Sequence, residues 1–294
     1  MKTLLLANRK GGVGKSALAC QLAFYFAQQR WRVLLLDFDH QCNASACLGK
    51  SRLVTVGEQS AAQLLSAAAI ELPAGEFVLV PGSEALGELE RQPERHNAAV
   101  NALLRFLDTA APRFDVCVID TNPNPDIRYG AAMIAADFLL SPIELNQEAV
   151  DGIAGLLRQG RYGYHRVKAA LNPRLELIGV LPNLVEPTQY QRANLQQLVT
   201  SFASLLIPVL RQGQRGYAYI PTRTAIAEAQ SAGVPLWLLR QAVPAHLQGK
   251  IDTGSMPLRS AARDAWHEVR PTFEEIARRM GLGGKGDAGF VGTR

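Results

Sequence analysis

The chain has 294 residues, of which 48% are hydrophobic and 19% charged, and its mean hydropathy is +0.00. This composition is that of a folded globular protein and excludes a largely disordered chain. Its net charge of +5 permits binding to nucleic acid or to an anionic membrane without establishing either. No apolar run approaches the roughly 18 residues of a membrane-spanning helix. Since the N-terminus also lacks a signal-peptide pattern, we expect a cytoplasmic protein.

Short apolar runs alternate with segments of helical periodicity along most of the chain. Runs that are apolar throughout are typical of parallel strands buried on both faces. Strands are therefore predicted over 3–7, 32–37, 114–120, 138–142, 175–181 and 217–221, with an edge strand over 76–80. Helices are predicted over 16–29, 57–69, 94–110, 126–136, 148–170 and 188–204. This alternation predicts an α/β fold, a mostly parallel twisted sheet flanked by helices on both faces.

One domain accounts for residues 1–235. Residues 236–281 are expected to form a loop, with Pro244, Gly249 and Gly254, and then a helix over 258–280. An apolar stripe along that helix predicts that it packs on the same domain, with a kink at Pro271. The glycine-rich end, 282–294, is predicted to be a disordered tail.

The segment NRKGGVGKSAL (8–18) lies between the first predicted strand and the first predicted helix. It ends like the phosphate-binding loop G-x-x-x-x-G-K-[ST]. Arg9 replaces the first glycine of that pattern, and a second lysine, Lys10, stands beside it. The loop therefore predicts a P-loop nucleotide site with an additional cation.

The other residues of this loop have separate roles. Its glycines let backbone N–H groups surround phosphate oxygens, and the following helix adds its dipole. Lys15 is expected to reach the β- and γ-phosphates, and the Ser16 hydroxyl to ligate Mg²⁺. The predicted nucleotide contacts here are Lys10, Gly11, Gly12, Val13, Gly14, Lys15, Ser16 and Ala17.

Three aspartates follow predicted strands. Asp37 and Asp120 end two of them, at the edge of the sheet where open α/β folds bind ligands. Their carboxylates are expected to reach the metal through its water molecules. Asp39 points the same way but lies further out.

Four segments resemble motifs of the ParA/MinD family of dimerising ATPases, in the correct order. KGGVGKS resembles the deviant Walker A motif, RVLLLDFDHQCNAS (32–45) the LLDxDPQxN motif, and FDVCVIDTNPNP (114–125) the Walker B strand with its switch. IPTRTAIAEAQSAGVPL (220–236) is similar to the family segment IPxxxxxxEAxSxGxPx. The resemblance covers residues 1–235 and identifies this region as a P-loop ATPase domain.

The resemblance implies further roles. Lys10 would cross the interface of an ATP-sandwich homodimer and contact the partner's phosphates, and Asp39 would position or activate the attacking water. Asn183 and Pro221 match positions that hold the adenine. Catalysis is thus expected from Lys10, Lys15 and Asp39, the metal ligands are Ser16, Asp37 and Asp120, and the cofactors are ATP or ADP with Mg²⁺.

The sequence departs from the family pattern at several positions. Ala17 stands where threonine is frequent, and His40 and Asn122 each replace a proline. These three changes are expected to affect turnover. Thr222 stands where relatives often have arginine, with Arg223 one place later, so the DNA-contacting arginines of relatives do not carry over directly.

The family resemblance implies a ParA-type ATPase of weak basal activity. It would bind nonspecific DNA in the ATP state, and a ParB-like partner or adaptor would stimulate its ATP hydrolysis. This cycle would partition DNA or position a cargo, and no binding to a membrane is expected. It would then be cytoplasmic and nucleoid-associated. Candidate DNA contacts are Arg211, Arg215, Arg223, Arg240 and Arg259.

Two alternatives stay open. A MinD-like membrane-cycling ATPase would need a terminal amphipathic helix, which GLGGKGDAGFVGTR does not offer. A P-loop enzyme of cofactor biosynthesis would need a substrate pocket, for which residues 40–110 leave room. Because the chain starts at the first strand, direct operator recognition by an N-terminal helix-turn-helix is not expected.

Overall fold

The computed structural model describes residues 1–158, 160–211, 213–240 and 259–283. A sheet of seven strands forms its centre, and all of its pairings are parallel. The spatial order is β3-β4-β2-β5-β1-β6-β7. These strands are β1 (Lys2–Leu6), β2 (Val33–Phe38), β3 (Thr55–Val56), β4 (Phe77–Val80), β5 (Val116–Thr121), β6 (Phe138–Glu144) and β7 (Glu176–Asn183). The predicted α/β fold is confirmed.

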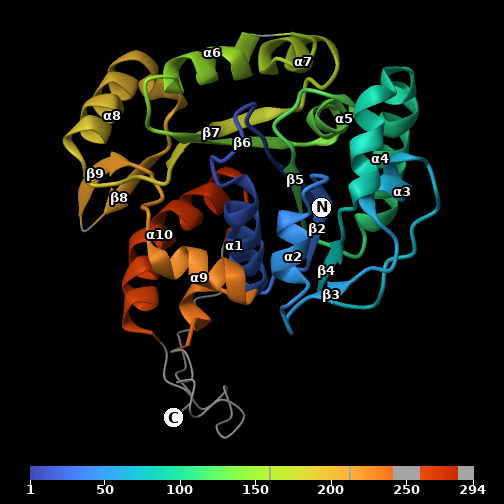
Figure 1. Ribbon diagram of the computed structural model, residues 1–294, viewed down its shortest axis with the longest axis horizontal. Coiled ribbons are helices and arrows are strands. Elements are labelled where there is room, and N and C mark those ends of the chain that lie inside the picture. Colours follow the sequence, from blue (N-terminus) through green and yellow to red (C-terminus); the bar gives the residue numbers. More distant parts are fainter. Residues whose placement is uncertain (159, 212, 241–258, 284–294) are drawn as a thin grey trace, which may run out of the picture.

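Helices cover both faces of this sheet (Figure 1). One face carries α1 (Lys15–Gln28), α2 (Asn43–Leu48), α9 (Thr224–Ala232) and α10 (Ser260–Arg279). The other carries α3 (Ala61–Leu65), α4 (His96–Ala110), α5 (Ile127–Ala135) and α7 (Tyr164–Ala170). Beyond β7, the helices α6 (Ala149–Arg158) and α8 (Gln189–Phe202) enclose a third, smaller cluster. Short 3₁₀ turns are η1 (Glu84–Arg91), η2 (Pro93–Arg95), η3 (Ala203–Leu205) and η4 (Leu236–Leu238).

Strand residues alternate between the two large cores. Leu35 of β2 and Leu4 of β1 face the α1 side, whereas Leu34 and Leu5 face the α4 side, and all four are fully buried. A strand buried on both faces needs apolar residues at successive positions. This is why the central strands read as continuous apolar runs.

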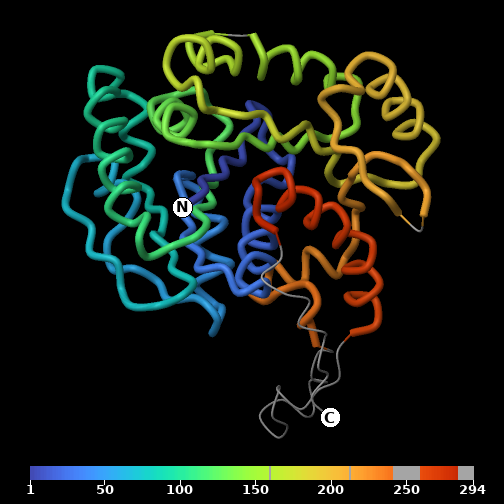
Figure 2. The backbone as a smooth tube through the Cα atoms, turned by 180° about the vertical axis from the view of Figure 1, so that it is seen from behind, coloured from blue at the N-terminus to red at the C-terminus, as the bar shows by residue number. Residues whose placement is uncertain are grey.

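Aromatic side chains hold α10 against α1. The ring of Tyr25 on α1 lies 6.1 Å from that of Trp266 and 5.8 Å from that of Phe273, between centroids. Trp237 of η4 packs 4.4 Å from Trp266. In the tube view, α10 lies beside α1 (Figure 2). The helix also continues through Pro271 to Arg279.

Three sequence predictions of local structure were wrong. Residues 218–221 form no strand, because after β9 (Gln214–Tyr217), which pairs with β8 (Pro208–Arg211), only isolated bonds tie them to their neighbours. The helix predicted over 148–170 is two helices, since Gly160 adopts a positive φ of 73° between them. Finally, β4 is not the edge strand, as β3 pairs outside it.

Two further sequence predictions concern residues that the structure does not describe. The loop with Pro244, Gly249 and Gly254 lies outside the described residues, as does nearly all of the predicted tail 282–294. Among the described residues, no helix combines the length and the apolar character needed to cross a membrane.

The contact between α10 and α1 can be tested at Phe273, which is 2% exposed. We expect Phe273→Ala to lower the free energy of unfolding by about 3–5 kcal/mol, because it removes a buried ring and leaves a cavity. Urea denaturation followed by circular dichroism measures this loss. The control is Arg263→Ala on the exposed face of the same helix, which should change stability by less than about 0.5 kcal/mol. Equal stability of the two variants would contradict the packing described.

Candidate nucleotide and metal site

The loop between β1 and α1 has the backbone of a phosphate-binding turn. Gly12 and Gly14 have φ angles of 77° and 78°, a region that favours glycine. A Cβ atom on Gly14 would collide with the amide of Asn183, whose Nδ2 donates to the Val13 carbonyl at 2.7 Å. Asn8 supports the other side of the loop, because its Oδ1 accepts from the Lys10 N–H at 2.8 Å. The turn is therefore fixed from both sides.

Lys15 points into the folded loop. It is 6% exposed, and its Nζ donates to the Lys10 carbonyl at 3.1 Å. Burial lowers the pKa of Lys15, while the nearby carboxylates of Asp120 and Asp39 oppose that shift. An ammonium group held this way is available to anionic oxygens that enter the loop.

Asp37 and Asp120 lie side by side on adjacent strands. They are paired in register between β2 and β5, and both are fully buried. Asp37 Oδ2 accepts from the Ser45 hydroxyl at 2.6 Å and from the Ser45 N–H at 2.8 Å, while its Oδ1 accepts from the Asp39 N–H at 3.1 Å. Burial raises the pKa of Asp37, and these hydrogen bonds act against the shift. Ser45, the last residue of RVLLLDFDHQCNAS, was not among the predicted site residues.

Asp120 has no such support. Neither carboxylate oxygen has a hydrogen-bond partner among the described residues. Burial, and after it the neighbouring charge of Asp37, raises the pKa of Asp120 well above its ordinary value. The nearby Ser16 hydroxyl and Lys15 ammonium favour the charged carboxylate and oppose this shift. A buried, unpartnered carboxylate is costly unless a cation compensates it. Hard oxygen donors at this point suit Mg²⁺ and its water molecules, so Ser16, Asp37 and Asp120 fit the metal expected here.

Two adjoining cavities run along the loop. A polar cavity of about 530 Å³ is lined by loop residues Gly11 to Ala17 other than Val13, and by Asp39. An apolar cavity of about 310 Å³ follows, with Asn183 and Pro221 in its wall. Ala17 and Gln230 line both. The structure thus brings the residues predicted for phosphate and for adenine to the two ends of one site. Gln230, in the segment EAQSAG, also lines this site but was not among the predicted residues.

Lys10 lies outside its own cavities. Its side chain is 39% exposed, and its Nζ donates to Glu148 Oε2 at 2.9 Å and lies 3.9 Å from Glu144 Oε2. The two lysines of the loop therefore separate, Lys15 inward and Lys10 outward.

Most of the arginines predicted to contact DNA already have partners in the chain. Arg211 is half-buried, stacks 4.0 Å from the centroid of the Tyr219 ring and donates to its carbonyl, and burial lowers its pKa. Arg223 pairs with Glu268 at 2.8 Å, and Arg259 pairs with Glu228. Arg240 is exposed and also makes an interaction. Arg215 is exposed on β9, in the β8–β9 hairpin.

An AAA domain family matches residues 1–177. The chain is 30% identical over 293 residues to protein IncC of Escherichia coli, covering 95% of this chain and 70% of that protein. It is also 30% identical over 237 residues to the chromosome-partitioning ATPase Soj of Thermus thermophilus, covering 79% of this chain and 86% of Soj. The chain belongs to the ParA/MinD family of ATPases. It is therefore an ATPase.

Solved structures agree with the fold and the cofactors. Apo McdA of Cyanothece superposes with a TM-score of 0.70 at 20% identity, over 96% of this chain and all of McdA, which bears on the fold alone. Cobyrinic acid a,c-diamide synthase from Mycobacterium smegmatis, with bound ADP and magnesium, is 28% identical with a TM-score of 0.60, over 79% of this chain and 91% of that one. The expected cofactors, ATP or ADP with Mg²⁺, are confirmed at the level of these related proteins.

Asp120 provides a test of the metal site. We expect ligand-free Asp120→Asn to be more stable than the wild type by about 1–3 kcal/mol, because a neutral amide replaces a buried, unpaired carboxylate. The folded-state pKa of Asp120 lies above its unfolded value, so the wild type loses stability as the pH rises through the interval between them. The variant avoids this loss, and its advantage should grow with pH.

Urea denaturation at several pH values without Mg²⁺ measures the difference, and the variant should also lose Mg²⁺-dependent ATP hydrolysis. Asp108→Asn, at an exposed position on α4, is the matched control and should change neither property. A ligand-free Asp120→Asn protein less stable than the wild type at pH 8 would contradict the assignment.

Proposed function

We propose that this chain is a ParA-type partition or positioning ATPase that closes into an ATP-sandwich homodimer. In the ATP state the dimer binds nonspecific DNA, and a ParB-like or adaptor partner stimulates hydrolysis and release. The protein would act in the cytoplasm on the nucleoid. Relatives named for chromosome partitioning, including Soj and a ParA of Caulobacter vibrioides at 31% identity, support this choice.

The position of Lys10 carries the proposal. A lysine that served only its own chain's nucleotide would line that chain's cavity, but Lys10 lies on its outer rim and Lys15 already lies inside. An exposed cation beside the phosphate loop is placed to meet the nucleotide of a second subunit. A trans cation of this kind can stabilise transition-state charge as an arginine finger does.

Within one subunit, the roles follow the site. Lys15 and the loop N–H groups bind phosphate oxygens, and Ser16, Asp37 and Asp120 hold Mg²⁺, which neutralises charge on the phosphates when bound. Asp39 borders the polar cavity and is 6% exposed, so its carboxylate is placed to orient a water molecule for attack. Phosphoryl transfer depends mainly on such positioning and electrostatics. Asn183 and Pro221 hold the adenine in the apolar cavity.

DNA binding through phosphates needs exposed cations that are not already neutralised. Among the five candidate arginines, Arg215 meets this condition best, because it projects from a hairpin of exposed residues. Arg223 and Arg259 would have to leave their carboxylate partners first. Arg211 is already occupied, because its guanidinium donates to the Tyr219 carbonyl and to the Thr272 hydroxyl of α10.

Ala17 gives a reason for weak basal turnover. Its methyl group borders both cavities, where a hydroxyl group would add a hydrogen bond to the nucleotide. Stimulation by the partner would then account for most of the hydrolysis.

An enzyme of cofactor biosynthesis is the second candidate, because a structure named for cobyrinic acid a,c-diamide synthesis is 28% identical to this chain. DNA binding that requires an ATP analogue would favour the partition ATPase over this enzyme. Binding to anionic liposomes instead of DNA would favour a MinD-like cycle.

Lys10→Ala tests the dimer. We expect this variant to bind ATP normally, because Lys10 does not line its own cavity. It should nevertheless fail to dimerise with an ATP analogue, and stimulated hydrolysis should fall by on the order of 100-fold or more, as when an arginine finger is removed. Analytical ultracentrifugation and a phosphate-release assay give the two readouts.

The opposite change is Glu148→Gln, which weakens the contact that holds Lys10 to its own chain. Surface ion pairs contribute at most about 1 kcal/mol each, and two such pairs change per homodimer, so dimerisation should strengthen by no more than about thirtyfold. Normal ATP-dependent dimerisation of Lys10→Ala would rule out the trans role.

Arg215→Ala tests the DNA surface. We expect weaker binding of the ATP-analogue form to duplexes of any sequence, and the slope of log K against log salt concentration should fall by about 1. Fluorescence anisotropy over a salt series measures both. Arg105→Ala removes an equal charge at an exposed position of α4, a helix on the opposite side of the molecule (Figure 1), and should leave DNA binding unchanged. Equal effects of the two variants would reject the hairpin as the contact.

A further inference from the structure

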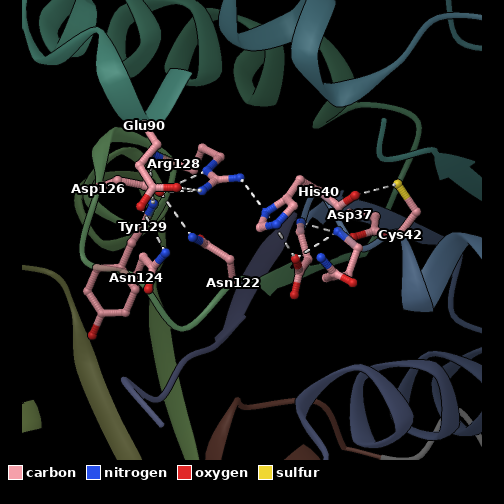
Figure 3. Close-up of polar contacts among 11 residues, drawn as sticks. Asp37, His40, Cys42, Glu90, Asn122, Asn124, Asp126, Arg128 and Tyr129 are labelled. Atoms are coloured by element: carbon pink, nitrogen blue, oxygen red, sulfur yellow. Dashed lines mark hydrogen bonds and ion pairs between the residues drawn. The ribbon is translucent and has the colours of Figure 1, made fainter. Parts of the chain in front are cut away.

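A buried arginine joins two loops of the site. Arg128, in the first turn of α5, is fully buried, and its Nη1 lies 3.2 Å from His40 Nδ1 (Figure 3). Its Nε donates to Asp126 Oδ2 at 3.0 Å, and its Nη2 lies 3.6 Å from Glu90 Oε2 of η1. A buried guanidinium needs partners of this kind. Here Asp126 is a local partner, whereas His40 and Glu90 come from two segments that are distant in sequence.

Asp126 extends this contact into the switch that follows β5. Its Oδ2 also accepts from Asn122 Nδ2 at 3.0 Å, and its Oδ1 accepts from the Arg128 N–H at 2.8 Å, which caps α5. Asn124 donates to Glu90 Oε1 at 2.9 Å. Asn122 and His40, the two residues that replace prolines of the family pattern, are therefore connected through Asp126 and Arg128.

His40 also lies next to Asp39, in the loop that follows β2. Arginine can only donate hydrogen bonds, so His40 Nδ1 is the acceptor in this contact. The same Nδ1 lies 3.6 Å from Asp39 Oδ1, which accepts from the Gln41 N–H at 3.0 Å. An imidazole lone pair facing a carboxylate oxygen cannot attract it. His40 therefore bounds the positions open to the Asp39 carboxylate on this side.

Packing also restricts the ring. The turn η1 passes beside it, since a Cβ atom on Gly87 would lie 3.9 Å from His40 Cβ. The His40 side chain is 33% exposed, whereas Arg128 is not exposed at all. The ring is thus held at its buried end by the arginine, and a substitution at His40 leaves the buried charge pair intact.

We propose that Arg128 and His40 are positioning residues for ATP hydrolysis: Arg128 fixes the His40 ring to the switch 122–126, and His40 in turn fixes the loop that carries Asp39. Neither residue lines the two nucleotide cavities, so neither is expected to contribute to nucleotide binding. The proposal rests on the role of Asp39 in the proposed function.

The test compares His40→Leu with His40→Asn. Leucine removes the acceptor, whereas the asparagine amide oxygen can occupy the place of Nδ1. We expect His40→Leu to lower kcat about tenfold, as is usual when a supporting hydrogen bond of a site is lost, with KM for MgATP and the Kd of a fluorescent ATP analogue unchanged. His40→Asn should keep most of the wild-type kcat. His165→Leu, at an exposed histidine on α7, is the matched control.

Two further variants separate the possible failures. Asp39→Ala should bind ATP without hydrolysing it, and if it hydrolyses ATP normally, the proposed role of Asp39 is wrong. If Asp39→Ala is inactive but His40→Leu retains full kcat, or if His40→Asn is as slow as His40→Leu, the positioning role is overturned. Arg128→Met, checked for folding by thermal denaturation, completes a double-mutant cycle with His40→Leu. Effects on kcat that multiply would show that the two residues act separately.

Discussion

The repulsion between two buried carboxylates is the constraint on which this site depends. Asp37 and Asp120 occupy the same register on adjacent strands, so the sheet itself forces them together. The protein relieves one of them with Ser45 and leaves the other without a partner. A fold that accepts this cost is more stable with a cation present than without one, since any ligand that binds only the folded state adds its binding free energy to stability. We therefore expect Mg²⁺ binding at this point to be coupled to folding.

The strand order converts distant sequence motifs into one site. Because β5 lies between β1 and β2, the phosphate loop, the Asp37 loop and the switch after β5 all emerge at one edge of the sheet. On the other side of the phosphate loop, β7 ends in Asn183, whose amide donates to the Val13 carbonyl of that loop. Few protein groups are needed because each is held by a strand end or by a neighbouring loop.

Sequence reasoning found what local patterns encode. The glycine-rich turn, the apolar strands and the aspartates at their ends each carry their own signal. They predicted the fold, which is confirmed, and the residues of the candidate site, which the structure brings together. Partners across the fold carry no such signal. Arg128 has the appearance of a helix-surface charge in the sequence, and only the meeting of α5, η1 and the His40 loop buries it. Likewise, Arg223 and Arg259 look available to a polyanion until Glu268 and Glu228 are placed beside them. Residues 218–221 read as a strand because their apolar character serves packing without a continuous ladder.

The packing of α10 has an optical consequence. All three tryptophans of the chain, Trp31, Trp237 and Trp266, belong to the hydrophobic cluster on the α1 side of the sheet or pack against it. That cluster includes the body of α1, whose first turn carries Lys15 and Ser16. Intrinsic indole emission therefore originates from one half of the molecule, the half attached to the phosphate loop. The opposite half, with α4 and α5, contributes no indole emission, so a change in that emission reports on the α1 side of the sheet alone.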